Sequence, residues 1–508
     1  MSDQSALSKL AGSALLILLA TIFGRGLGFV GEVIIVRSLE PSVYGQLALA
    51  YTVVSSLATL TLVGIHEGVT RQFSATSSST QRIRIVWTGY SILLVSSIVS
   101  ILGIYLLRWQ LSSIMGEDHL STTLLLFLPY LFVYPLWQVS KGTLRGQQRT
   151  LPVVISNEFS GRLTAIICLG GFILLGETYY GPVVYWIGYP LISTLVALYF
   201  IKKSVETQQL VTALPDAETL RKLWSFSWPL AVGSSVFLLL SNLDILMIGY
   251  FLESESVGFY RSVQPLKQVA TFALGSFTFL FLPLATEHYA DRNITELDEL
   301  FTVSTKWVLI ITLPPLIVFG FFSTDIVRVF FGREYLPAAP VLSILVLGLL
   351  SRALSGLDGD MVKAINRPRI ELYAAILGML ANFTLNILLI PVYGITGAAL
   401  ATVTGYIVYN TAELICIYRL VGATPFSLNI VKYVATVLLL GMLASVLITP
   451  ALSLIGLAVL GICFTLIQPI VLILTHSVEP ADLALLEDVE SKIGKDLKLL
   501  KRLVKYGL

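Results

Sequence analysis

Long apolar stretches alternate with short polar loops along the chain, from near Ala11 to near Leu474. A helix that crosses the hydrocarbon core of a bilayer needs roughly 20 predominantly apolar residues. About fourteen stretches have that length, so we predict about fourteen transmembrane helices and no sizeable soluble domain. The predicted spans are about 11–36, 44–66, 84–107, 121–140, 152–175, 181–201, 224–251, 257–285, 303–323, 338–357, 370–391, 395–418, 430–449 and 451–474.

The composition supports this interpretation and excludes several classes of protein. Of the 508 residues, 56% are hydrophobic and 13% are charged, against about 25% charged residues in ordinary soluble domains. The segments of alternating polarity that are typical of a β-barrel are absent. A net charge of +2 does not suggest a nucleic-acid partner, and Cys168, Cys416 and Cys463 all fall in apolar segments. We therefore expect an all-α polytopic membrane protein with no disulfide framework, metal site or cofactor.

Positive charges indicate the orientation in the membrane. In alternate loops, the side that holds both termini has about 24 Lys and Arg residues and the opposite side about five, and cytoplasmic loops are the ones enriched in these residues. Both termini are therefore predicted to lie in the cytoplasm of a cell-membrane protein. The tail, 477–508, has apolar residues at spacings of three and four with lysines between them. This pattern predicts an amphipathic helix on the anionic cytoplasmic leaflet; the alternative is a solvated helix.

Two similar segments indicate an internal repeat. Leu39–Gly45 closes the first apolar stretch and Leu252–Gly258 closes the seventh, at an offset of 213 residues. At this register Gly31, next to Glu32, falls opposite Asp244. The offset corresponds to six crossings, so the two copies have the same orientation. Parallel repeats of this kind are typical of transporters that rock two halves around a substrate.

Four motifs resemble a known family, the Wzx-type polysaccharide flippases of the multidrug/oligosaccharidyl-lipid/polysaccharide exporter superfamily. The motifs are Gly24-Arg25-Gly26 through Gly45, Lys141 to Gly146, Asn242 to Tyr260, and Asn366 to Thr402 with Pro391 and Gly394 within it. The resemblance implies two pseudo-symmetric six-helix lobes around a central cavity, 1–205 and 206–425, two extra helices in 426–476, and the tail. It also implies that an isoprenoid phosphate- or pyrophosphate-linked oligosaccharide moves from the cytoplasmic to the outer leaflet.

Charges at membrane depth are the candidates for the chemistry of transport, because each one costs about 2.5–3.5 kcal/mol at a helix centre. Arg25 lies near the middle of the first span, and Gly24, Gly26 and Gly28 beside it are expected to let other groups approach closely. Arginine suits phosphate recognition. Arg25 is our first candidate for an anion ligand. The alternative is a structural contact, either with Glu32, which lies two turns away on the same helix face, or with another helix.

Further candidates lie in both predicted lobes. Glu158 and Arg162 are four residues apart, so they can neutralise each other on one helix face, or Arg162 can bind substrate. In the eighth span Lys267 and Arg261 are substrate-binding candidates, although Arg261 can also extend to the outer interface. Glu32, Asp244 and Glu158 are the candidates for binding a coupling proton or sodium ion.

Other polar and aromatic residues have simpler interpretations. Residues at cytoplasmic helix ends are expected to be solvated, namely Arg352, Glu413, Glu67 and His66. Asp358-Gly-Asp360 is interpreted as a loop, and the glycine pattern of residues 26–31 lacks the strand context of a dinucleotide site. Aromatic residues near helix ends are expected to form interfacial belts, namely Trp109, Tyr130, Trp137, Trp186 and Trp228.

These observations favour a flippase for a lipid-linked oligosaccharide that works by alternating access in cell-surface polysaccharide synthesis or protein glycosylation. A cation-coupled multidrug exporter and a flippase for the peptidoglycan precursor are the alternatives within transporters. A membrane-embedded glycosyltransferase or polymerase would need a large catalytic loop, and the longest loops have only about 20 residues. We therefore expect no enzymatic activity. The expected partners are the lipid-linked glycan, on a polyprenyl or dolichyl carrier, and membrane lipid.

Overall fold

The computed structural model describes residues 2–147, 149–203, 214–270, 272–448 and 451–478, and it describes their side chains except at 2–19, 229–241, 268–276 and 279–280. This part of the chain is helical between short loops and contains no strand. Helices cover each of the fourteen predicted apolar segments, and ten of the described helices are long and apolar enough to cross a membrane. The all-α polytopic fold is therefore confirmed, whereas the predicted tail helix lies almost wholly outside the described residues.

Contacts divide the chain into two compact units, Met1–Ser262 and Val263–Leu508. The first unit therefore extends beyond residue 205, and the lobe boundaries drawn from the sequence stay a prediction. Its elements are α1 (Ser2–Ser38), α2 (Pro41–Thr61), α3 (Ile65–Ala75), α4 (Ser79–Ile114), α5 (Leu120–Phe127), α6 (Tyr130–Gly146), α7 (Thr150–Val154), the π-helix η1 (Ile155–Ser160), α8 (Gly161–Leu174), α9 (Tyr180–Lys203), α11 (Ala217–Phe251) and α12 (Ser254–Ser262).

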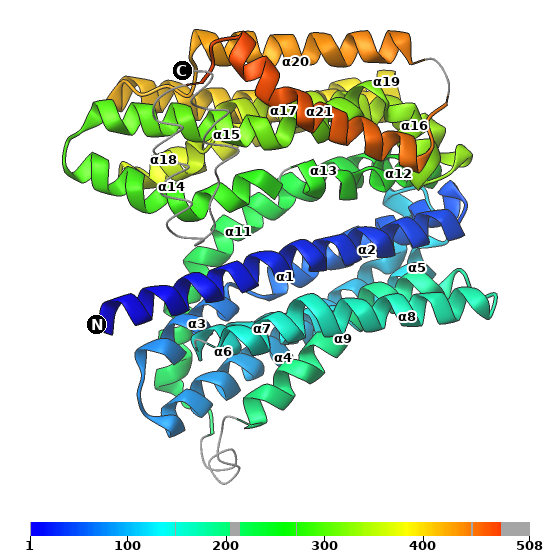
Figure 1. Cartoon of the computed structure of the whole chain (residues 1–508). Coiled ribbons are helices and arrows are strands. Elements are labelled where there is room, and N and C mark those ends of the chain that lie inside the picture. The colour runs from blue at the N-terminus through cyan, green and yellow to red at the C-terminus, as the bar shows by residue number, and fades with distance from the viewer. Residues whose placement is uncertain (1, 148, 204–213, 271, 449–450, 479–508) are drawn as a thin grey trace. The chain divides into compact units, whose positions relative to one another are not determined.

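A serine side chain repairs the break that one proline makes in a helix of the first unit. Pro135 lies inside α6 and has no N–H, so the carbonyl of Leu131 one turn earlier loses its helical partner. The Ser97 hydroxyl on α4 donates to that carbonyl at 2.9 Å. Within the hydrocarbon region every backbone group needs a protein partner, so this bond also ties α4 to α6. Figure 1 shows α1 running beside α7 and α8, which it contacts.

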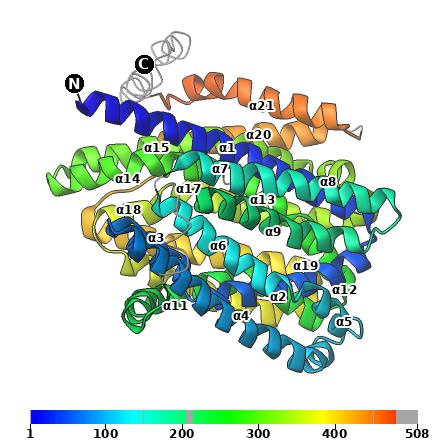
Figure 2. The ribbon, with the colours of Figure 1, turned by 90° about the horizontal axis from the view of Figure 1, so that it is seen from below.

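The second unit contains α13 to α21. Its elements are α13 (Gln264–Ala270), α14 (Phe272–Ala290), α15 (Ile294–Phe321), α16 (Ser323–Phe330), the 3-10 helix η2 (Arg333–Ala338), α17 (Ala339–Ser355), α18 (Asp358–Ala364), α19 (Arg369–Val421), α20 (Leu428–Leu447) and α21 (Leu454–Leu474). The helix α15 is central, because it packs against α14, α17, α20 and α21 (Figure 2).

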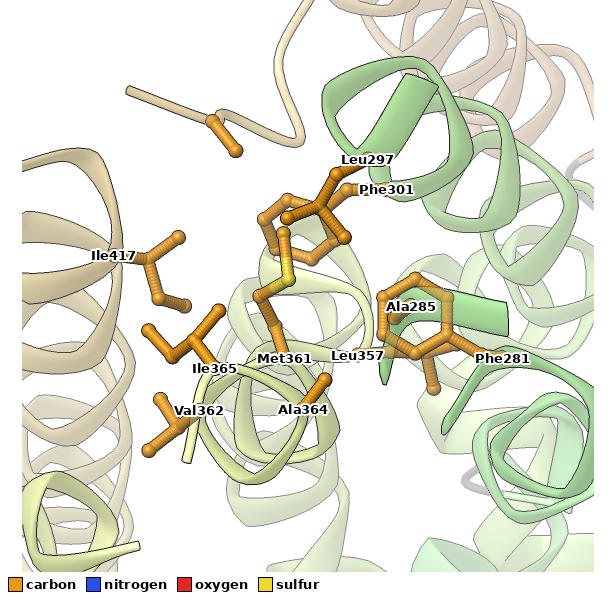
Figure 3. Close-up of a cluster of buried hydrophobic side chains, with 11 residues drawn as sticks. Phe281, Ala285, Leu297, Phe301, Leu357, Met361, Val362, Ala364, Ile365 and Ile417 are labelled. Atoms are coloured by element: carbon orange, nitrogen blue, oxygen red, sulfur yellow. The ribbon is translucent and has the colours of Figure 1, made fainter. Parts of the chain in front are cut away.

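A cluster of buried apolar side chains forms part of the core of the second unit. Figure 3 shows side chains of α14, α15, α18 and α19 converging there, with Met361 directed toward Phe301. The helix α18 begins at Asp358, which is 7% exposed, so the interpretation of residues 358–360 as a loop is wrong. Burial of Met361, Val362 and Ile365 on the following turns favours a helix at this point.

A tight break separates two of the predicted spans. Residues 370–391 and 395–418 were expected to be separate spans, and α19 consists of two helices that cover them. The break is at Gly394, whose φ of 59° and ψ of −138° lie outside the helical region. Glycine adopts this conformation because it has no Cβ. The two helices pack against each other, because a Cβ atom at Gly378 would lie 2.8 Å from the Gly405 carbonyl oxygen.

Candidate substrate-binding site

Two glycines of α1 bring that helix close to η1 and α8. A Cβ atom at Gly24 would collide with Glu158 Oε2, and one at Gly28 would collide with the Arg162 guanidinium, whereas a Cβ at Gly26 would meet nothing within 4 Å. The glycine-rich segment around Arg25 was expected to allow close approach. The structure confirms this for Gly24 and Gly28, which receive the two charged side chains.

Glu158 lies in the single π-helical stretch among the described residues. π-Helical turns inside α-helices are frequent at functional sites, because the extra residue re-aims the side chains around it. Glu158 is 9% exposed and accepts a hydrogen bond from the Asn157 amide. Its Oε2 lies 3.8 Å from Arg162 Nε, which confirms the predicted pairing on one helix.

This first charged pair is incompletely satisfied. Glu158 Oε2, Arg162 Nε and Asn157 Oδ1 are all buried without a hydrogen-bond partner. The guanidinium carbon of Arg162 lies 5.0 Å from the centroid of the Tyr189 ring on α9, a position that favours the cation. A buried polar atom without a partner costs about 1–3 kcal/mol. The site therefore has donor and acceptor capacity that a ligand could use.

A second charged pair joins α1 to α12. Glu32 Oε1 accepts a hydrogen bond from Trp186 Nε1 at 2.9 Å and lies 3.9 Å from a terminal nitrogen of Arg261. Glu32 Oε2 and Arg261 Nε are buried without hydrogen-bond partners. Arg261 thus points toward Glu32, and its extension to the outer interface stays a prediction.

Aromatic rings connect the two charged pairs. Successive ring centroids lie 4.6, 5.4, 5.2, 5.7 and 5.0 Å apart in what we call the aromatic series, which consists of Trp186, Tyr51, Tyr130, Tyr134, Trp137 and Tyr189. Gln138 donates to the Tyr134 hydroxyl at 2.8 Å, and Lys141 Nζ lies 5.2 Å from the Trp137 ring centroid. The indole N–H of Trp137 is buried without an acceptor.

The interfacial interpretation of these aromatic residues is wrong for three of them. Tyr130, Trp137 and Trp186 are 4%, 6% and 4% exposed, whereas Trp109 and Trp228 are more than half exposed. Sequence reasoning missed the series because an aromatic residue near a helix end fits either position. The spacing of Tyr130, Tyr134 and Trp137 by four and three residues, which places them on one helix face, was the available signal.

The remaining predicted residues lie elsewhere. Arg25 is exposed and forms no ion pair with another described residue, so the structural pair of Arg25 with Glu32 is not observed. Asp244 on α11 is 5% exposed and accepts a hydrogen bond from the Tyr260 hydroxyl at 2.9 Å. Lys267 belongs to the second unit, on α13, where it is half-buried.

Glu413 does not lie at a solvated helix end. It is fully buried on α19, and both of its carboxylate oxygens lack a hydrogen-bond partner.

Within the described residues, no group of three or more His, Cys, Asp and Glu side chains is placed to hold a metal ion. The first unit therefore offers paired charges, unpartnered polar atoms and aromatic faces, which are means of binding a ligand.

Comparison with known proteins identifies relatives along the chain. The sequence model of the family described as "Polysaccharide biosynthesis protein" matches residues 10–287, and the model described as "MatE" matches residues 229–388. The probable low-salt glycan biosynthesis flippase Agl15 of Haloferax volcanii is 23% identical over 402 residues, which cover 78% of this chain and 81% of that protein. The uncharacterized membrane protein MJ1068 of Methanocaldococcus jannaschii is 30% identical over 190 residues, and this match spans 37% of this chain but only 38% of that protein.

A solved structure shares the fold. The structure of the lipid II flippase MurJ in an inward closed conformation aligns with a TM-score of 0.71 at 17% identity, covering 89% of this chain and 98% of that one. At this identity the likeness concerns the fold alone.

Proposed function

The chain belongs to the polysaccharide biosynthesis protein family, and on that premise we propose that it is a flippase for an isoprenoid phosphate- or pyrophosphate-linked oligosaccharide. The glycan lipid moves from the cytoplasmic to the outer leaflet of the cell membrane by alternating access, for cell-surface polysaccharide or protein glycosylation. Support comes from the Haloferax volcanii relative, a probable glycan biosynthesis flippase, which aligns over most of both chains.

The observation that carries the proposal is the combination of unpartnered charged atoms and aromatic rings in the first unit. A phosphate cannot cross hydrocarbon alone, because burying an unpaired charge is very costly. The guanidinium groups of Arg162 and Arg261 each retain a buried N–H without a partner, and arginine binds phosphate oxygens in a fixed geometry. The half-buried rings of the series, those of Tyr51, Tyr134 and Tyr189, offer apolar faces to sugar C–H groups, beside carboxylate oxygens that accept sugar hydroxyls.

We assign roles to the charged residues on this basis. Arg162 and Arg261 bind the phosphate groups within the first unit, Arg25 meets the anion as it enters, and Lys267 contributes from α13. The candidates for binding a coupling proton or sodium ion are Glu158, Glu32 and Asp244. Glu32 and Asp244 lie at nearly equivalent positions of the two copies of the repeat. No covalent step is required, so the protein acts without enzymatic chemistry.

We also propose the membrane arrangement that the sequence predicts. It has two six-helix lobes around a central cavity, in 1–205 and 206–425, two further helices in 426–476, and the amphipathic tail on the cytoplasmic leaflet. Both termini are cytoplasmic, because the loops on that side hold most of the Lys and Arg residues.

The test reconstitutes the purified protein into liposomes that contain an isoprenoid pyrophosphate-linked oligosaccharide. A membrane-impermeant glycosidase added outside measures how fast the glycan reaches the outer leaflet. We expect protein-dependent exposure that Arg25→Ala abolishes, while the same substitution leaves the amount of folded protein unchanged. Exposure at the rate of protein-free liposomes would refute the proposal, and full activity of Arg25→Ala would refute the role of Arg25.

Two other transport functions are tested in the same liposomes, with a drug or lipid II in place of the lipid-linked oligosaccharide. The match of the MatE model to residues 229–388 favours a cation-coupled drug exporter as the second candidate. The fold shared with the lipid II flippase makes the peptidoglycan precursor the other candidate substrate. Drug efflux without glycan exposure, or exposure of lipid II alone, would identify these functions.

A further inference from the structure

The second unit contains two acidic side chains that the proposed transport site does not use. Glu413 on α19 is completely buried, and Asp358 at the start of α18 is 7% exposed. Their carboxyl groups lie within hydrogen-bonding reach of each other. Both helices belong to the second unit, whereas the two charged pairs of the proposed substrate site lie in the first. We call Asp358 and Glu413 the acidic pair.

The local sequence directs Asp358 inward. Gly356 ends α17 with a φ of 67°, and a Cβ atom there would collide with Thr305 on α15. Glycine suits this position on both counts, because it tolerates a positive φ and has no side chain. The turn starts α18 at Asp358, whose Oδ1 accepts a hydrogen bond from the Gly359 nitrogen at 2.9 Å. Other side chains of α18 belong to the apolar cluster of Figure 3, so this helix cannot turn its acid to solvent without uncovering that cluster.

Within the described part of the chain, three oxygen atoms of the acidic pair are buried without a donor. They are both carboxylate oxygens of Glu413 and Oδ2 of Asp358. A Cβ atom built on Gly359 would lie 4.0 Å from Glu413 Oε2 and 3.8 Å from Glu371 Oε1, so a third acid faces the same point. The Tyr409 hydroxyl would lie 3.9 Å from that Cβ, but it does not donate to Glu413. The acidic pair therefore has acceptors and lacks a donor.

Two nearby cations do not supply this donor. Lys363 Nζ lies 3.4 Å from Glu371 and 3.8 Å from Asp360, so its charge is shared between these two acids. Arg352 on α17 is half-buried and interacts electrostatically with Asp358. Among the described side chains, however, none donates to any of the three orphaned oxygens. Arg352 makes Asp358 the more favourable position for the negative charge of the acidic pair.

One proton resolves both difficulties at this position. Two adjacent carboxylates cannot both stay ionised in a buried site, because their repulsion adds to the cost of burying each charge. With a proton on Glu413, its O–H donates to Asp358 Oδ2, which gives that oxygen the partner it lacks. The remaining negative charge is then on Asp358, on the side of Arg352. Two carboxyl groups that share one proton in this way titrate as a pair.

We propose that the acidic pair is a proton-binding site of the second unit, and that the shared proton holds α18 against α19. The loop that contains α18 carries Lys363, Arg367 and Arg369, and loops rich in such residues lie in the cytoplasm, so the proton comes from that side. A rise in pH removes the proton, leaves two adjacent negative charges and favours separation of α18 from α19. The site is distinct from the candidates for a coupling ion, and it does not depend on the proposed function.

Hydrogen exchange at the backbone amides of α18 tests the proposal in the purified full-length protein, because it measures how often this helix opens. The protection factor is corrected for the pH dependence of chemical exchange. It should fall about tenfold per pH unit once the proton has left, since each opening then releases one proton fewer. Glu413→Gln should remove this dependence, because its amide N–H donates to Asp358 at every pH.

Asp298→Asn is the matched control. Asp298 is a half-buried acid of the same unit, but it already accepts a hydrogen bond from the Thr424 nitrogen at 2.7 Å. Its substitution should leave the pH dependence of α18 as it is in the parent.

Infrared difference spectroscopy detects the proton itself, because a protonated carboxyl group absorbs at a different frequency from a carboxylate. The parent should show a protonated carboxyl band that disappears as the pH rises, and Glu413→Gln should lack this band. Spectra of the parent need no variant, so the proposal stays testable if Glu413→Gln does not fold, as judged by monodisperse elution in detergent. Both measurements are repeated with choline in place of sodium.

Equal pH dependence of α18 in the parent and in folded Glu413→Gln would overturn the proposal, and so would a parent spectrum without the band. Protection of α18 that requires sodium would also overturn it, because the acidic pair would then bind a metal cation. Neither measurement uses a lipid-linked glycan. Failure of glycan exposure in liposomes would therefore reject the proposed function and leave the proton site standing.

Discussion

In the first unit, Arg162 and Arg261 each retain a buried guanidinium N–H without a partner, whereas two cations of the second unit, Lys306 and Arg328, donate to backbone carbonyl groups. Lys306 is 1% exposed and donates to the Ser477 carbonyl at 3.0 Å, just after α21. Arg328 donates to the Leu452 carbonyl at 3.1 Å and pairs with Asp325. A cation that caps a helix or loop end serves the fold, whereas one that keeps an open donor is prepared to bind an anion.

The difference has a local cause in each unit. The π-helical turn η1 and the glycines of α1 hold Glu158 and Arg162 close together without completing their hydrogen bonds. In the second unit, by contrast, Lys306 reaches across from α15 to the end of α21, where unpaired carbonyl groups are available. Buried cations are thus available to bind a ligand in the first unit and hold helix ends together in the second unit.

The largest effect is expected from neutralising the charged pair on η1 and α8. The double substitution Glu158→Gln, Arg162→Gln keeps the shapes of both side chains and leaves neither charge unpaired. Loss of the phosphate contact should lower the rate of glycan exposure in liposomes about a hundredfold, which corresponds to about 2.7 kcal/mol. The matched control, Asp325→Asn with Arg328→Gln, removes a local pair of the second unit and should leave the rate per folded molecule unchanged. Equal losses of the exposure rate in both double variants would contradict the proposed difference between the two units.

Lys306→Met should mainly lower stability. Methionine fills similar space but leaves the Ser477 carbonyl without its buried donor, which costs about 1–3 kcal/mol. Thermal unfolding of the detergent-solubilised protein measures this loss. The account would be wrong if the variant unfolded like the parent and had instead lost transport.

Gly24→Ala tests the close approach of α1 to Glu158. The added methyl group must displace the carboxylate, and we expect a loss of about 1–3 kcal/mol in stability together with slower transport. Gly26→Ala, two residues away, meets open space and should be neutral or slightly stabilising. Thermal unfolding is measured for both variants, so that the effect of packing can be distinguished from the effect of helix propensity. Equal unfolding temperatures would contradict the observed packing.

The smallest effect on stability is expected from Trp137→Phe, which should slightly stabilise the protein. Removing an indole N–H that is buried without an acceptor relieves a cost of about 1 kcal/mol. The smaller phenyl ring packs less completely, which offsets part of this stabilisation. If a sugar hydroxyl is the missing acceptor, the concentration of glycan lipid for half-maximal transport should rise about tenfold. Unchanged substrate dependence would remove Trp137 from the site.

Local patterns in the sequence predicted much of this arrangement. Apolar stretches of membrane length predicted the helices, the glycines around Arg25 predicted close approach at Gly24 and Gly28, and the four-residue spacing predicted the Glu158–Arg162 pair. Each of these depends on residues that are close in sequence. The register of the repeat also placed Gly45 opposite Gly258, and the structure brings them into contact.

The misplaced residues depend on neighbours that are distant in sequence. Glu32 pairs with Arg261 on α12, and nothing near either residue specifies the other. Tyr130, Trp137 and Trp186 have the composition of an interfacial belt, and only the packing of α2, α6 and α9 shows that they are buried together. Glu413 lies near the end of an apolar span, where a solvated position is the usual one, but the neighbouring helices cover it.

The most direct test of the central claim is an equilibrium binding measurement on the purified protein. Two ligands with the same oligosaccharide and isoprenoid chain are compared, one linked through pyrophosphate and the other through a neutral ether. We predict that the parent protein binds the pyrophosphate ligand at least about a hundredfold more tightly, and that Glu158→Gln with Arg162→Gln removes most of this preference. An undiminished preference in that variant would contradict the claim that the open cations of the first unit bind the phosphate.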